Sequence, residues 1–137
     1  MKNFKLIYLL AFALVTVTIT SCSDDDEDHN NTVAITIDKP MDGGIIAMAD
    51  CDNVQITIDI LASDENHEIE ILLHPEGDVD TKIIDVDLHE HDAEINFEQG
   101  INLCNFPAGT CFHLEVEACV DHDCEEKATA DAEFCLQ

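Results

Sequence analysis

The chain has 137 residues, of which 31 are Asp or Glu and five are Lys or Arg, and its formal net charge is −26 at pH 7. Such a charge disfavours binding to nucleic acids and to anionic membranes, because both need basic patches. It suits the binding of cations or basic peptides, or simple solubility. The length is enough for one folded domain.

The first 21 residues have the features of a secretory signal peptide. Lys2 and Lys5 precede an apolar run over 6–19, which is shorter than the ~20 residues of a membrane-spanning helix. The run leads into Ile19-Thr20-Ser21-Cys22, which resembles the lipobox of bacterial lipoproteins. That resemblance implies cleavage before Cys22 and attachment of acyl chains such as palmitate to Cys22, which anchors the chain in a membrane.

Residues 22–31 are expected to form a lipidated, disordered tether, because the segment after Cys22 is acidic and has no apolar residue to bury. An acidic run in this place resembles the export signal of Bacteroidota-type surface lipoproteins. The resemblance implies an outer-membrane lipoprotein displayed at the cell surface, with an orientation toward the periplasm as the alternative. The folded domain is then expected over 32–137.

Alternating apolar residues predict a series of short strands. Successive turns are rich in Gly, Pro, Asp and Asn, and no window has helical periodicity. The strands are expected around Val33–Ile37, Val54–Ile60, Ile69–Leu73, Ile84–Leu88 and Ile95–Phe97, followed by a final pair over 111–120 and 127–136; Ile45–Met48 is a short continuation of the first.

The last two strands are expected to form a β-hairpin around a polar turn. If Val116 faces Ala130, the apolar faces of both strands coincide, because strand side chains alternate with period two. The same register places Cys111 opposite Cys135.

Six cysteines remain beside Cys22, and an even number in a secreted chain indicates three disulfides, with 15 connectivities open. The alternative is a thiolate metal site that includes Cys119 and Cys124. Their spacing lacks the second close pair of a zinc ribbon, and an oxidising compartment favours disulfides.

About seven short strands at this spacing predict an all-β, antiparallel β-sandwich. The residues Ile37–Pro40 with Gly43-Gly44, the turn Pro107–Thr110 and the alternating strand Leu114–Asp121 resemble the Ig-like and fibronectin type III-like domains of bacterial surface lipoproteins. The chain departs from many such domains in its cysteine content and in having no Trp.

The topology of an Ig-like sandwich implies a preferred set of disulfides. The implied pairs are Cys51–Cys104, Cys111–Cys135 and Cys119–Cys124. The main competing arrangement joins Cys104 to Cys111 and Cys51 to Cys135.

The function expected from the sequence is non-catalytic binding of an unknown protein or envelope partner by a lipid-anchored surface domain. No phosphate-binding loop, G-x-S-x-G elbow or H-E-x-x-H motif is present, so no catalytic residue is assigned and a small hydrolase is the third choice.

A metal-binding lipoprotein is the second choice. In the Ig-like topology, one sheet has an outward face of acidic residues and histidines. His89 and His91 are two residues apart on one strand and are expected to share a Zn²⁺, Cu²⁺ or Ni²⁺ ion, with a carboxylate or His113 from a neighbouring strand. The full candidate set is His74, Asp87, His89, His91 and His113.

A calcium-type site is an alternative in the turn of the hairpin. Asp121, Asp123 and Glu125 offer the carboxylate oxygens that Ca²⁺ prefers, although they do not fit the EF-hand pattern. A solvated acidic turn explains the same residues. No role is expected for His29 or His67.

Overall fold

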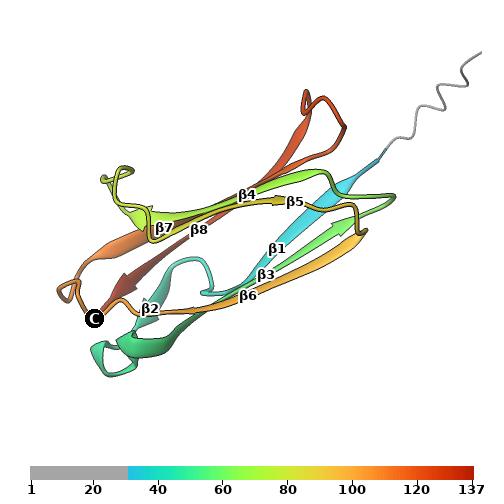
Figure 1. The fold of residues 1–137 in the computed structure, drawn as a ribbon. Helices are drawn as coiled ribbons and strands as arrows, with labels where there is room; N and C mark the ends of the chain where they lie inside the picture. The colour runs from blue at the N-terminus through green and yellow to red at the C-terminus, as the bar shows by residue number, and fades with distance from the viewer. Residues whose placement is uncertain (1–30) are drawn as a thin grey trace, which may run out of the picture.

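A computed structural model describes residues 31–137 as two β-sheets packed face to face (Figure 1). The three-stranded sheet has the order β1-β3-β6, and the five-stranded sheet has the order β2-β8-β7-β4-β5. The strands are β1 (Val33–Lys39), β2 (Gly44–Ile46), β3 (Val54–Ala62), β4 (Glu68–Pro75), β5 (Ile84–His89), β6 (Glu94–Ile101), β7 (Cys111–Cys119) and β8 (Lys127–Leu136). The expected all-β sandwich is confirmed.

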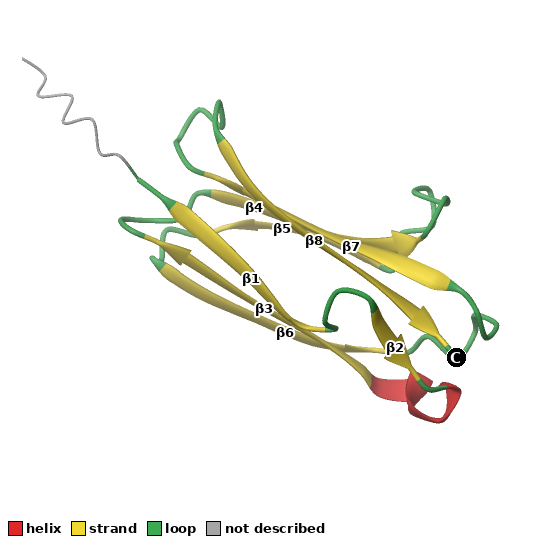
Figure 2. Cartoon of the chain, turned by 180° about the vertical axis from the view of Figure 1, so that it is seen from behind, coloured by secondary structure: helices red, strands yellow, loops and turns green. Residues whose placement is uncertain are grey.

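The structure adds one strand to the seven expected. The segment around Ile45 is not a continuation of the first strand, because β2 leaves that sheet and pairs in parallel with β8. A short 3₁₀ helix, η1 (Met48–Asn53), follows it and returns the chain to β3. Figure 2 shows β2 and η1 at the same end of the sandwich as the C-terminus.

The register of the β7–β8 hairpin is the one predicted, with Val116 opposite Ala130 and Cys111 opposite Cys135. This register aligns the apolar faces of both strands toward the other sheet. Buried side chains from both sheets meet there, including Ile56, Ile58, Ile60, Ile69, Ile71, Leu73, Phe112, Leu114, Val116, Phe134 and Leu136.

Three disulfides join Cys51 to Cys104, Cys111 to Cys135 and Cys119 to Cys124. These are the preferred pairs, so the competing arrangement and the thiolate metal site are not what the structure shows. The first pair links η1 to the segment after β6, and the second links β7 to β8 in register.

The signal segment, Cys22 and most of the expected tether lie outside the described residues. Asn31, the last residue of the expected tether, binds the domain: its side-chain nitrogen donates hydrogen bonds to the carbonyl oxygens of Glu65 at 2.8 Å and Val120 at 2.9 Å. In residues 31–137, no helix is long and apolar enough to cross a membrane.

The outer face of the three-stranded sheet concentrates acidic side chains around Asp59 on β3. Partial desolvation raises the pKa of Asp59, and repulsion from Asp38, a hydrogen bond with Asp38 and the charges of Glu94 and Glu98 raise it further. The folded state therefore holds this proton more tightly than the unfolded state does. The associated stability is present below pH 3.8, the pKa of an ordinary Asp, and is lost as the pH rises through the higher folded pKa.

Asp59→Asn is therefore expected to raise the melting temperature at pH 7, because it removes a repelled charge, and to have little effect at pH 3. Thermal unfolding followed by far-UV circular dichroism at both pH values measures this. Asp123→Asn, in an exposed loop, removes an equal charge as the control. A gain for Asp59→Asn that is the same at pH 3 and pH 7 would contradict the electrostatic explanation.

Candidate metal centres

Each of the six histidines in the described residues lies next to another histidine, and five of them belong to two separate clusters. Three connections at the end of the sandwich where β1 begins bring together Glu65, His67, His91 and His122, which we call the end cluster. Near the other end of the five-stranded sheet, β4 and β7 place His74, His113 and Glu115 on its outer face, and we call these residues the face cluster.

The end cluster is assembled from loops that are far apart in the sequence. Glu65 and His67 lie between β3 and β4, His91 lies between β5 and β6, and His122 lies in the β7–β8 turn. These connections lie at the same end of the sandwich in both overall views (Figures 1 and 2).

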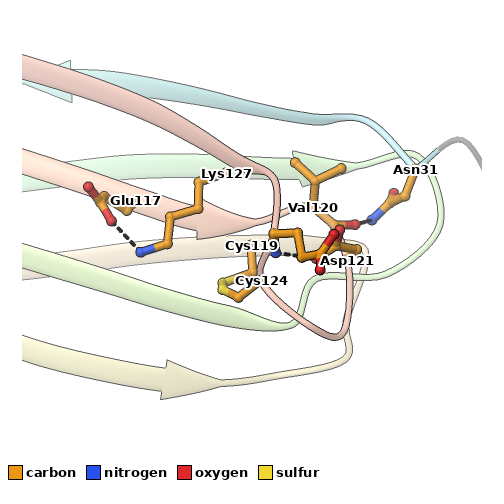
Figure 3. Close-up of a disulfide and its surroundings, with 8 residues drawn as sticks. Asn31, Glu117, Cys119, Val120, Asp121, Cys124 and Lys127 are labelled. Atoms are coloured by element: carbon orange, nitrogen blue, oxygen red, sulfur yellow. Dashed lines mark hydrogen bonds and ion pairs between the residues drawn. A yellow bond between two sulfur atoms is a disulfide. The ribbon is translucent and has the colours of Figure 1, made fainter.

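The loop that carries His122 is held at its base. Cys119 and Cys124 close the turn, and Asn31 binds the carbonyl oxygen of Val120 (Figure 3). Inside the turn, the carboxylate of Asp121 accepts a hydrogen bond from the backbone N–H of Glu125 at 2.9 Å. Together these contacts restrict the position of His122 relative to the body of the sandwich.

Glu65 lies between two imidazoles of the end cluster. Its Oε2 is 3.4 Å from Nδ1 of His91, and its Oε1 is 3.6 Å from Nε2 of His122. The ring of His67 lies against that of His122, with 4.1 Å between the centroids. One ligand atom each from Glu65, His67 and His122 lies within 4.8 Å of the others.

His67 is the buried member of the end cluster, at 6% exposed, whereas His91 and His122 are open to solvent. Its Nδ1 is buried and has no hydrogen-bond partner among residues 31–137. A buried polar atom without a partner costs about 1–3 kcal/mol, so such atoms are rare in folded proteins and call for a ligand or another explanation.

The face cluster is built by direct pairing of β4 with β7, in which His74 lies opposite His113. The Oε1 of Glu115 is 3.1 Å from Nδ1 of His113 and 3.6 Å from Nε2 of His74. His74 is 3% exposed, and its Nε2 is buried without a hydrogen-bond partner in the part of the chain that the structure describes.

The structure divides the metal set expected from the sequence. His89 and His91 remain neighbours, with 5.1 Å between ring centroids, but His113 does not join them. His89 lies opposite Glu68 and His113 lies opposite His74, which is six residues further along β4, or about 20 Å. The expectation that His113 completes a shell around His89 and His91 is therefore wrong.

Asp87 lies opposite Glu70 in the middle of the β4–β5 pair, and it belongs to neither cluster. The calcium-type residues do not converge either: Asp121 is engaged within its own turn, and Asp121, Asp123 and Glu125 are absent from the groups of possible ligands among residues 31–137. A third group, Glu68 with Cys119 and Cys124, offers no thiolate, because those cysteines form a disulfide.

Sequence reasoning missed Glu65, His67 and His122 as members of one site. Each lies in a loop, where no periodicity indicates which way a side chain points. No protein-family model matches the chain, and no curated protein matches it.

Proposed function

We propose that this chain is a lipid-anchored envelope protein whose domain binds a divalent transition-metal ion at the end cluster without catalysing a reaction. The observation that carries the proposal is the buried imidazole of His67, which lies beside His122 and the carboxylate of Glu65 and whose Nδ1 finds no hydrogen-bond partner within the described residues.

The separations in the end cluster suit a shared ion. Zinc binds imidazole nitrogen and carboxylate oxygen at about 2.0–2.2 Å, so neighbouring ligand atoms of a tetrahedral site lie roughly 3.3–3.5 Å apart. The Glu65 oxygens lie 3.4 Å and 3.6 Å from nitrogens of His91 and His122. Glu65, His67 and His122 already converge, whereas His91 contacts the other oxygen of Glu65 and is exposed, so it would have to rotate to join the same ion.

The chemistry of the donors selects among cations. Three imidazoles and one carboxylate suit Zn²⁺ or Cu²⁺, whereas Ca²⁺ takes six to eight oxygen ligands. The formal charge of −26 also draws cations toward the domain. The ligand set therefore favours zinc or copper over calcium.

The position of the end cluster relates it to the proposed anchor. Asn31 binds the backbone of Glu65 and of Val120, so the chain enters the domain beside the cluster. With acyl chains on Cys22, only a short tether separates the membrane from this end. We propose an outer-membrane, surface-displayed location, with the metal site on the side of the domain that faces the lipid.

Titration of the purified, metal-free full chain with Zn²⁺ in an isothermal calorimeter tests the end cluster. Excess Ca²⁺ in the buffer competes with zinc for nonspecific binding to surface carboxylates. We expect saturable zinc binding. The double variant His91→Gln/His122→Gln is expected to weaken binding at the end cluster by at least about 10–100-fold, because loss of a residue that only orients a ligand already weakens metal affinity by that much.

His89→Gln is the matched control: His89 contacts the ring of His91, and it is His91 whose Nδ1 lies 3.4 Å from the carboxylate of Glu65. It is expected to leave the affinity within a few-fold of the parent value. The proposal fails if His91→Gln/His122→Gln binds zinc in the same stoichiometry and affinity as the parent, or if His89→Gln causes an equal loss.

A further inference from the structure

The face cluster contains two imidazoles whose protonation pattern is set by their surroundings. Nδ1 of His74 lies 2.9 Å from the carbonyl oxygen of Pro75. A carbonyl oxygen can only accept a hydrogen bond, so Nδ1 of His74 carries the proton and donates it. In the neutral ring, Nε2 then holds a lone pair.

The buried Nε2 of His74 lies near another acceptor. The nearest charged atom is Oε1 of Glu115, at 3.6 Å, and both it and the buried Nε2 are electron-rich. Glu115 is partly exposed, but Nε2 of His74 is buried, and a buried acceptor that faces another acceptor is unfavourable unless a cation or a proton lies between them. The side chain of His74 is buried and its Nδ1 is bound to the carbonyl oxygen of Pro75, so the ring is not free to turn to water as an exposed ring is.

His113 repeats this arrangement from the neighbouring strand. Its Nδ1 is 3.1 Å from the same oxygen of Glu115, and its Nε2 is 3.8 Å from Oδ2 of Asp131 on β8. Metal-binding histidines commonly direct the nitrogen that does not bind the metal at a carboxylate or a backbone carbonyl, which fixes the tautomer and the orientation of the ring. Asp131 lies in that position for His113, and the carbonyl of Pro75 lies there for His74.

We propose that the face cluster is a second metal site, in which His74 Nε2, His113 Nδ1 and Glu115 Oε1 bind one Zn²⁺ or Cu²⁺ ion. The nitrogen–oxygen separations of 3.1 Å and 3.6 Å bracket the roughly 3.3–3.5 Å edge of a tetrahedral site. One ligand atom from each of the three residues lies within 4.8 Å of the others.

The face site differs from the end cluster in having three protein ligands. A groove along β7 and β8, lined by His113, Glu115, Asp131 and Glu133, runs beside it. The fourth position of the ion faces this groove and is filled by water or by a donor group of a bound molecule, as in other three-ligand zinc sites. Of the two clusters, the face cluster is therefore the one where a bound metal ion can also bind an external ligand.

The inference does not rest on metal binding at the end cluster, and the experiment keeps the two apart. In the full chain carrying Glu65→Gln, His91→Gln and His122→Gln, we expect one Zn²⁺ to remain bound in the presence of excess Ca²⁺. Adding Glu115→Gln is expected to weaken that binding by at least about 10–100-fold. Bound Co²⁺ reports the geometry, because a tetrahedral ion absorbs visible light far more strongly than a hydrated one.

Glu133→Gln is the matched control, because Glu133 lies opposite His113, lines the same groove and carries the same charge without belonging to the face cluster. It is expected to leave the Co²⁺ spectrum unchanged. Asp131→Asn is expected to lower the affinity by about 10-fold or more, as the loss of an orienting carboxylate does.

The inference is overturned if the triple variant binds no Zn²⁺ or Co²⁺, or if Glu115→Gln and Glu133→Gln have equal effects. If the triple variant binds no metal but the parent chain binds zinc, the proposal for the end cluster still stands. Far-UV circular dichroism verifies folding, and Asp131→Asn, an exposed surface change, gives an independent reading if Glu115→Gln unfolds the domain.

Discussion

Replacing Cys51 and Cys104 together with alanine is expected to lower the free energy of unfolding by about 4 kcal/mol. The disulfide closes a loop with a sequence separation of 53 residues, and the chain-entropy model gives about 4 kcal/mol for a loop of that length. Far-UV circular dichroism during urea unfolding measures this without an intrinsic tryptophan, which the chain lacks.

The other two disulfides form a graded control. Cys111–Cys135 spans 24 residues and Cys119–Cys124 spans five, so the same model gives about 3.4 and about 2 kcal/mol for their removal. The expected order of loss follows the loop lengths. Equal losses for the longest and shortest loops would show that restriction of the unfolded chain is not what these bonds contribute.

Phe112→Ala is expected to lower the free energy of unfolding by about 3–5 kcal/mol, as is usual for a large buried aromatic residue. Phe112 is fully buried on β7, where its ring packs edge-on against Phe106 at 5.1 Å and stacks with Phe134 at 5.3 Å between centroids. Its removal leaves a cavity between the sheets that the two neighbouring rings fill only partly. Urea unfolding at pH 7 measures the loss.

Phe106→Ala serves as the comparison for this prediction, because Phe106 contacts the same ring but is only partly buried. Its loss removes less contact area and opens the gap toward solvent, so we expect a clearly smaller effect than for Phe112→Ala. The packing explanation would be contradicted by a Phe106→Ala effect as large as that of Phe112→Ala.

Phe112 and the Cys111–Cys135 disulfide lie at the end of the sandwich that carries the face cluster. Phe112 is the residue before His113 and lies opposite Pro75, whose carbonyl orients His74. The buried aromatic group and the Cys111–Cys135 bond therefore hold the backbone that places both imidazoles. The end cluster depends instead on Asn31 and on the Cys119–Cys124 turn.

Period-two alternation was sufficient to predict most strands and the β7–β8 register, because an error of one residue turns an entire apolar face toward water. The short strand β2 was missed as a separate strand. It has three residues, Gly44–Ile46, of which Ile45 is exposed, so burial leaves almost no pattern in the sequence there.

For the candidate sites, alternation predicted which residues share a face but not which residues meet. His74 and His113 were expected on one outward face, and they are there, yet their contact depends on the register of β4 against β7, which no local pattern specifies. Grouping His113 with His89 and His91 failed for the same reason, since residues on one face of a sheet can be a strand length apart.

The sequence by itself determined the positions of all strands but β2, the hairpin register and the acidic character of the outer faces, because side-chain alternation is a local property of the chain. Only the tertiary structure decided that loops after β3, β5 and β7 bring Glu65, His67, His91 and His122 together, and that Glu115 lies between His74 and His113. Such meetings depend on how strands pair and stack across long separations, and the identity of the residues in a loop does not encode them.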